Sequence, residues 1–141
     1  MRVIDKIIIH CSATIEGKNY SAKDVEAWHK ERGMKKIGYH FVINLDGLCE
    51  KGRSIEEIGA HCIRQNENSI GICYIGGLDK NGCPKDTRTA AQVRSMDNLL
   101  KDLLKELRFI QPGLKITVHG HREYANKACP CFDARQEYIN Y

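Results

Sequence analysis

Apolar residues occur in short clusters along this chain, and their spacing predicts strands alternating with helices. The run Ile4–His10 is rich in β-branched residues and predicts a strand that is buried on both faces. Tyr39–Leu45 alternates and leads into Asp46-Gly47, which is a strong signal for a hairpin turn. Further strands are expected over Leu48–Lys51, Ser69–Ile75 and Lys115–His119.

Two capping-box spacings mark the expected starts of helices. Ser21 and Asp24 lie three residues apart, and the helix that begins there should run to about Gly33. Thr89 and Gln92 have the same spacing, and apolar residues then recur along one helical face. That face comprises Val93, Met96, Leu100, Leu103 and Leu107, flanked by Leu99 and Leu104. Pro112-Gly113 breaks the chain after it, and 132–138 should form a final helix.

The predicted order β-α-β-β-β-α-β-α indicates an α/β fold with a mixed central sheet and helices on its faces. The 141 residues suit one domain, so we expect a single domain over residues 1–141. The chain shows no internal repeat, low-complexity tract or linker. Its 42% hydrophobic and 28% charged residues are ordinary for a soluble globular protein.

Charge and cysteine content narrow the range of functions. The formal charge of +4 is spread along the chain without a basic stripe, so we expect no nucleic-acid partner. Seven cysteines cannot all pair within one chain, which favours synthesis in a reducing compartment. The first apolar run is too short for a signal peptide or a membrane span. We therefore expect synthesis in the cytoplasm without a signal peptide and no insertion into a membrane.

Histidines and one cysteine gather near the predicted strand ends. His10 ends the first strand, His119 and His121 end the last, and Cys129 follows eight residues after His121. Strand ends are where α/β sheets usually carry their sites. Two His and one Cys from distant segments match a catalytic zinc site, in which water takes the fourth position, rather than a zinc finger. Periodicity does not choose between His119 and His121, which can share one face of a strand.

Five segments extend this picture to a family: IIIHCSAT, WHKERG, GYHFVINLDG, NSIGICYIGG and GHREYANKACPCFD. Together they resemble the phage-lysozyme-type N-acetylmuramoyl-L-alanine amidases, which belong with the peptidoglycan recognition proteins. The resemblance runs from about Ile7 to Asp133. It implies zinc-dependent hydrolysis of the amide bond between N-acetylmuramic acid and L-alanine in bacterial peptidoglycan.

The resemblance also implies roles for individual residues. It selects His121 over His119 and implies one Zn²⁺ per chain, held by His10, His121 and Cys129. It further implies that Tyr39 and Lys127 are catalytic. A cation or hydroxyl directed at the carbonyl oxygen of an amide stabilises the negative charge that develops there during hydrolysis.

Other residues are read from the sequence alone or depart from the family pattern. His61 follows Gly59-Ala60 in a loop and is expected to line the substrate cleft. Cys131 stands where Ser or Gly is more usual in the family, and it could replace Cys129 as a ligand. Trp28 has core spacing on its helix, and His40 is expected to be a buried structural histidine. Glu123 could orient a ligand or pair with a surface charge.

Peptidoglycan is the partner that the resemblance implies, and the protein is expected to be a monomer. Without a signal peptide, it would reach the wall by release through a partner pore, or it would act in the cytosol as a wall-recycling enzyme. Two other functions compete with this interpretation. Wall-binding modules of the recognition-protein branch lack the ligand Cys, which this chain keeps as Cys129. A cysteine hydrolase with Cys11 or Cys129 as nucleophile would keep its activity under strong chelation.

Overall fold

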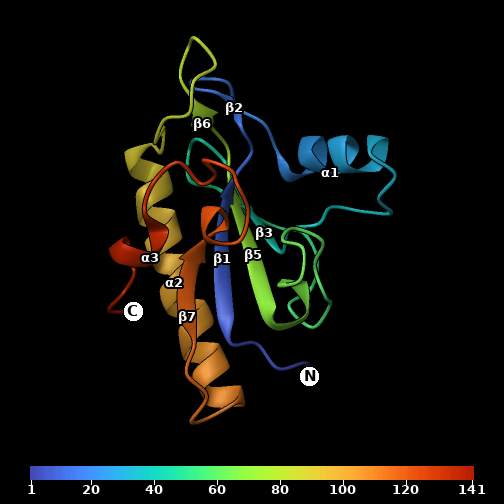
Figure 1. Ribbon diagram of the computed structural model, residues 1–141, viewed down its shortest axis with the longest axis vertical. Helices are drawn as coiled ribbons and strands as arrows, with labels where there is room; N and C mark the ends of the chain where they lie inside the picture. The colour runs from blue at the N-terminus through green and yellow to red at the C-terminus, as the bar shows by residue number, and fades with distance from the viewer.

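The central feature of the fold is a five-stranded mixed sheet with the strand order β4-β3-β5-β1-β7 (Figure 1). The computed structural model describes all residues 1–141. The strands are β1 (Lys6–Cys11), β3 (Phe41–Ile43), β4 (Cys49–Lys51), β5 (Ser69–Tyr74) and β7 (Thr117–Gly120). All neighbours pair in parallel except β3 and β4, which form the predicted hairpin. The chain therefore has the predicted single-domain α/β fold with a mixed sheet.

Short elements complete the architecture. β2 (Thr14–Ile15) and β6 (Gly77–Leu78) form a separate parallel pair beyond the ends of β1 and β5. Two 3-10 turns, η1 (Asn66–Asn68) and η2 (His121–Glu123), precede β5 and follow β7. The strand ends differ from the prediction by at most two residues. In particular, Tyr39 and His40 lie just before β3 instead of inside it.

Both predicted capping boxes are formed. The side chain of Ser21 accepts the N–H of Asp24 at the start of α1 (Ala22–Glu31), and Thr89 accepts that of Gln92 at the start of α2 (Ala90–Ile110). Gly33 has a φ of 89°, the left-handed conformation that follows many helix ends. The last helix, α3 (Ala134–Glu137), is shorter than predicted because Asp133 caps its first turn.

Helices α2 and α3 cover one face of the sheet and enclose the main core (Figure 1). The buried stripe of α2 begins at Gln92, whereas Val93, which the prediction placed on this stripe, is 40% exposed. The Gln92 amide donates to the carbonyl oxygens of Ile43 and Ile75 and thus satisfies two buried acceptors. Leu100 and Leu107 are fully buried further along the stripe.

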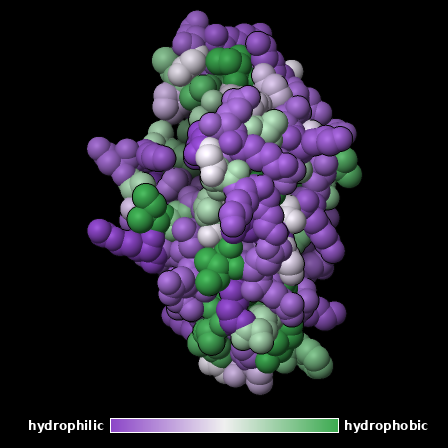
Figure 2. All heavy atoms as spheres, turned by 90° about the vertical axis from the view of Figure 1, so that its right-hand side faces the viewer, coloured by the Kyte–Doolittle hydropathy of each residue, from purple (hydrophilic) through white to green (hydrophobic).

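The opposite face of the sheet carries buried polar residues, among them His10 and His40. Side chains alternate across a strand, so Ile9 and Cys11 of β1 join the main core while His10 points to the other side. Residues 52–68 form the loop over this side, and α1 projects outward beside it (Figure 1). Figure 2 shows that the molecular face on the α1 side is mostly hydrophilic. None of the helices is long and apolar enough to cross a membrane.

Candidate metal centre

Three potential metal ligands meet at the carboxyl ends of β1 and β7. These strands pair in parallel, so His10 near the end of β1 lies close to His121, the residue that follows β7. Cys129 belongs to the loop after η2, and its Sγ accepts the backbone N–H of Cys11 at 3.1 Å. The ligand atoms of His10, His121 and Cys129 all lie within 4.8 Å of one another.

The donor set and its spacing suit a metal such as zinc. Nδ1 of His10 and Nδ1 of His121 are 3.1 Å apart. Tetrahedral zinc with Zn–N bonds of about 2.0–2.1 Å separates two ligand nitrogens by about 3.3 Å. His10 is 1% exposed, whereas His121 and Cys129 are only partly buried. Solvent therefore has access to the group from the side of His121 and Cys129 but not from the side of His10. These three residues are therefore positioned to hold a metal, as predicted.

The electrostatic environment keeps both imidazoles neutral. Burial lowers the pKa of His10 well below its ordinary value, and the neighbouring His61, His121 and Lys127 lower it further. The pKa of His121 is also lowered, first by burial and then by the charge of Lys127. Metal binding requires deprotonated ligands. The two histidines therefore need no proton removed from a charged ring before they bind a metal.

Tyr39 and Lys127 come from different parts of the chain, and both influence this group. The ring of Tyr39 lies 5.0 Å from that of His10 and 5.3 Å from that of His29, centroid to centroid. Burial raises the pKa of Tyr39 well above its ordinary value, so its phenol stays protonated and can donate. Lys127 is exposed in the loop between η2 and Cys129, and its charge acts on both His10 and His121.

The sequence and the fold agree on one family. The pattern of the N-acetylmuramoyl-L-alanine amidases matches residues 1–132. The chain belongs to this family. The endolysin of Escherichia phage T7 is 39% identical over 132 residues, which cover 94% of this chain and 83% of the endolysin. Peptidoglycan-recognition protein LB of Drosophila melanogaster is 35% identical over 111 residues, covering 78% of this chain and 44% of that protein.

Solved structures give the same answer. The amidase LysC from Clostridium intestinale URNW superposes with a TM-score of 0.76 at 25% identity and covers 95% of this chain and 80% of its own. Wild-type Drosophila PGRP-LB superposes with a TM-score of 0.73 at 27% identity, over 100% of this chain and 82% of its own. The protein is thus an N-acetylmuramoyl-L-alanine amidase with peptidoglycan as its substrate.

In this amidase, His61 lies directly behind the candidate ligand His10. Its Nδ1 is 2.8 Å from Nε2 of His10, and its Nε2 is 3.3 Å from Oγ of Ser69. Burial, followed by the nearby His40 and His121, lowers the pKa of His61 to about 3. Both ring nitrogens therefore have partners inside the protein. The substrate-binding role expected for His61 stays a prediction.

The remaining histidines of the amidase are engaged elsewhere. His119 contacts Glu123 through Nδ1 at 2.9 Å and Thr117 through Nε2 at 2.7 Å, and it is not part of the ligand group. Glu123 therefore holds His119 rather than His121, and it also accepts the N–H of Gly120. His40 is fully buried, as predicted, and its Nδ1 accepts the N–H of Gly71.

Cys131 points away from the candidate centre. Its Sγ donates to the carbonyl oxygen of Gly77 at 3.3 Å and lies 3.9 Å from Sγ of Cys11. Burial raises the pKa of Cys131 to about 11, which disfavours the thiolate that a metal needs. All seven cysteines are free thiols. Cys129 is the sulfur that belongs to the ligand group.

Two contacts were missed by sequence reasoning. His29 is buried in α1, accepts the N–H of Gly38 through Nδ1 and packs against Tyr39. Its spacing of four residues from the buried Val25 could have revealed its orientation. Ser69 was predicted only as the first residue of the strand Ser69–Ile75. No local signal indicates that its hydroxyl reaches His61.

Proposed function

We propose that this amidase depends on one zinc ion per chain, held by His10, His121 and Cys129. It would cut the amide bond between N-acetylmuramic acid and L-alanine. The observation that carries the proposal is the convergence of two imidazoles and one thiol whose ligand atoms lie within 4.8 Å of one another. Two His and one Cys leave the fourth position of a tetrahedral zinc for water or substrate, which is the arrangement of a catalytic site.

The protein residues around this centre can carry the remaining chemistry. Bound zinc supplies a water of lowered pKa, about 7, and polarises a carbonyl. Lys127 can place its ammonium group near the amide oxygen as that oxygen gains negative charge. Tyr39, which stays protonated, can donate a hydrogen bond to the same oxygen or to a group that must be protonated. Neither side chain in these states is an ordinary zinc ligand, so both would act on the substrate.

Zinc content tests the ligand assignment with a matched pair of variants. Cys129→Ser removes the sulfur of the ligand group, whereas Cys131→Ser removes a neighbouring thiol that bonds to Gly77. Elemental analysis should find about one zinc in the wild type and in Cys131→Ser, and a large loss in Cys129→Ser. Full zinc and full activity in Cys129→Ser would refute the assignment. Loss in Cys131→Ser alone would transfer the role to Cys131.

The products of digestion test the reaction. Purified peptidoglycan treated with the amidase should release peptides with a free N-terminal alanine and leave the glycan strands intact. New reducing sugar ends without free alanine amines would instead identify a glycosidase. A strong chelator should abolish the release, and added zinc should restore it. Activity that survives complete removal of zinc would favour a cysteine hydrolase.

We also propose the bacterial cell wall as the place of action and the monomer as the active form. The similarity to phage proteins named endolysins supports a role in wall lysis. Release from the cytoplasm through a partner pore belongs to the same proposal. Light scattering of the zinc-loaded protein would detect a dimer and refute the monomer.

A further inference from the structure

A chain of hydrogen bonds links the candidate ligand His10 to the protein backbone. We propose that His61 and Ser69 are positioning residues that fix the tautomer and the orientation of His10 for metal binding. The chain runs from His10 through His61 and Ser69 to the carbonyl oxygen of Gln65. The inference rests on the proposed role of His10 as a ligand. It adds two residues that would set how tightly this ligand binds.

The direction of each hydrogen bond in this series follows from the last one, which ends at the carbonyl oxygen of Gln65. Oγ of Ser69 lies 2.7 Å from the carbonyl oxygen of Gln65, which can only accept, so the Ser69 hydroxyl donates there. Oγ of Ser69 then accepts from Nε2–H of His61 at 3.3 Å. A neutral imidazole carries one hydrogen, so Nδ1 of His61 keeps its lone pair and acts as an acceptor.

The same logic determines the state of His10. Its Nε2 is 2.8 Å from the acceptor Nδ1 of His61 and must carry the hydrogen. Neutral His10 therefore has its lone pair on Nδ1, the atom that lies 3.1 Å from Nδ1 of His121 in the ligand group. Metal binding requires a ring nitrogen without a hydrogen. The carbonyl oxygen of Gln65 thus selects that nitrogen of His10 through the hydrogen bonds of Ser69 and His61.

The fold leaves His61 very little freedom. A Cβ at Gly71 would lie 2.5 Å from Cγ of His61, and one at Gly59 would lie 2.7 Å from its Cδ2. Real Cβ atoms essentially never approach other atoms so closely. These two glycines therefore form a slot that fits the His61 ring. The slot requires a glycine at position 71, the Gly of the NSIGI segment. The spacing of residues along the sequence does not reveal this requirement.

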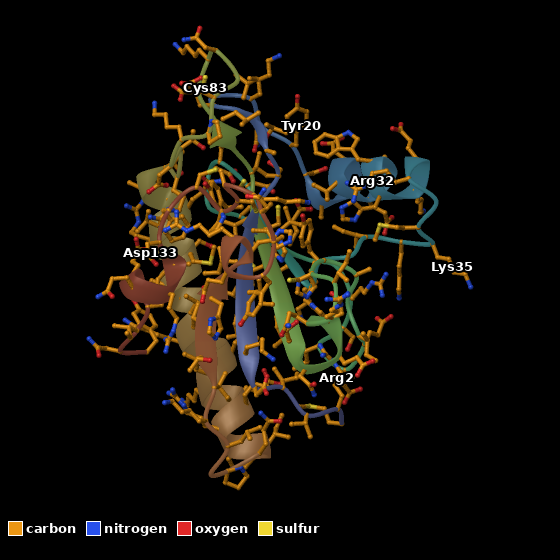
Figure 3. All side chains as sticks on the ribbon, viewed as in Figure 1. Arg2, Tyr20, Arg32, Lys35, Cys83 and Asp133 are labelled. Carbon is orange, nitrogen blue, oxygen red and sulfur yellow. The ribbon has the colours of Figure 1, made fainter.

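The loop that carries His61 is itself held in place. Oδ1 of Asn66 accepts the backbone N–H groups of His61 and Cys62, both at 2.9 Å. Arg2, labelled near the amino end of β1 in Figure 3, donates to the carbonyl oxygens of Ile55, Asn66, Glu67 and Ser69. The guanidinium of one N-terminal arginine thus ties both ends of the loop to Ser69. His61 is positioned before any metal binds.

Loss of such a hydrogen-bond partner usually lowers metal affinity by about 10- to 100-fold. We therefore expect His61→Leu, which fills the slot without an acceptor, to weaken zinc binding by about 10- to 100-fold, measured by competition with a chelator. His61→Asn keeps an acceptor oxygen near the position of Nδ1 and should recover most of that loss. A recovery by Asn would not occur if His61 only filled space.

Two serine variants distinguish an effect on the hydrogen bonds to His10 from a general loss of stability. Ser69→Ala removes the hydroxyl that fixes His61, whereas Ser12→Ala removes a hydroxyl at the other end of the sheet that bonds to Thr14 and Gly76. Both variants should lower the melting temperature of the metal-free protein slightly. Only Ser69→Ala should also weaken zinc binding, by several-fold. Equal zinc affinities in the two variants would contradict the proposal.

Nitrogen-15 NMR of the metal-free wild type tests the proposal without any variant. We expect His10 and His61 both to carry their hydrogen on Nε2, and Ser69→Ala to show mixed tautomers of His61. A hydrogen on Nδ1 of His61 in the wild type would overturn the proposal, even if His61→Leu fails to fold. None of these measurements uses peptidoglycan. Failure of the zinc assignment would appear separately, as full zinc retention in Cys129→Ser.

Discussion

At the scale of single residues, the candidate centre combines two kinds of group. His10, His121 and Cys129 are positioned to hold a metal, while we propose that Tyr39 and Lys127 act on the substrate. Removing one preorganised donor typically slows turnover by about 10- to 1000-fold. The five side chains come from four separate parts of the chain.

Tyr39→Phe and Lys127→Ala should therefore keep the fold and the zinc but lower kcat by roughly tenfold to a thousandfold. The Michaelis constant should change less, because the lost interaction is made mainly in the transition state. Zinc analysis and steady-state kinetics on one peptidoglycan preparation check this. Tyr20→Phe is the matched control, since Tyr20 packs against Trp28 beside α1 (Figure 3). Wild-type kcat in either variant would remove that residue from the mechanism.

Sequence motifs predicted these residues better than they predicted the contacts among them. The motifs around His10, His121 and Cys129 named the members of the ligand group, and the structure brings the three together. The contact of His61 with His10 joins residues 51 positions apart. It depends on a loop conformation that Arg2 and Asn66 fix through tertiary hydrogen bonds. No periodicity in the sequence carries that information.

At the scale of the elements, local sequence signals predicted the starts of both long helices correctly, but they placed the strand ends less exactly. The capping boxes at Ser21 and Thr89 involve residues three apart, so the sequence contains both partners. A strand ends where its neighbour ends, and the neighbours here are distant in sequence. Helix α2 shows one correct and one incorrect prediction. Its apolar stripe was recognised, but the stripe begins at the buried Gln92, whose amide caps sheet carbonyls, rather than at Val93.

Two truncations on α2 test where this stripe lies. Leu100 is fully buried in the main core, so Leu100→Ala should lower the free energy of unfolding by about 2–5 kcal/mol through lost contacts and a cavity. Val93 is 40% exposed, so Val93→Ala should cost less than about 1 kcal/mol. Urea unfolding of the metal-free proteins gives both values. Similar losses for the two variants would show that the helix packs in a different orientation.

At the scale of the whole molecule, the order of the strands decides where the candidate metal centre lies. The order β4-β3-β5-β1-β7 places the first and last strands side by side, and their parallel pairing brings His10 to His121. The sequence predicted a mixed sheet but not this order, because the adjacency of strands rests on contacts between distant segments. Helices α2 and α3 seal one face (Figure 1), so the histidines concentrate on the other.

Burial of neutral histidines on that face has a consequence for stability against pH. His40 is fully buried, and its pKa falls to about 4, chiefly through burial, with Arg2 and Arg53 lowering it further. Unfolding returns His40 to an ordinary pKa of about 6.5. Between these values the unfolded chain binds the extra proton, so stability is fully present above about pH 6.5 and is lost as the pH falls toward 4.

We therefore expect the free energy of unfolding of the metal-free amidase to fall between pH 6.5 and pH 4.5. The contribution of one such histidine is at most about 1.4 kcal/mol per pH unit. His40→Asn keeps an acceptor near the position of Nδ1, which bonds to the N–H of Gly71, but it cannot take up a proton. The variant should be less stable than the wild type at pH 7.5 yet show a shallower loss on acidification. Urea unfolding with a chelator at several pH values measures both slopes. Identical slopes would mean that His40 is not one of the buried groups whose protonation opposes folding, and its role would be limited to the hydrogen bonds it makes with Gly71 and Glu57.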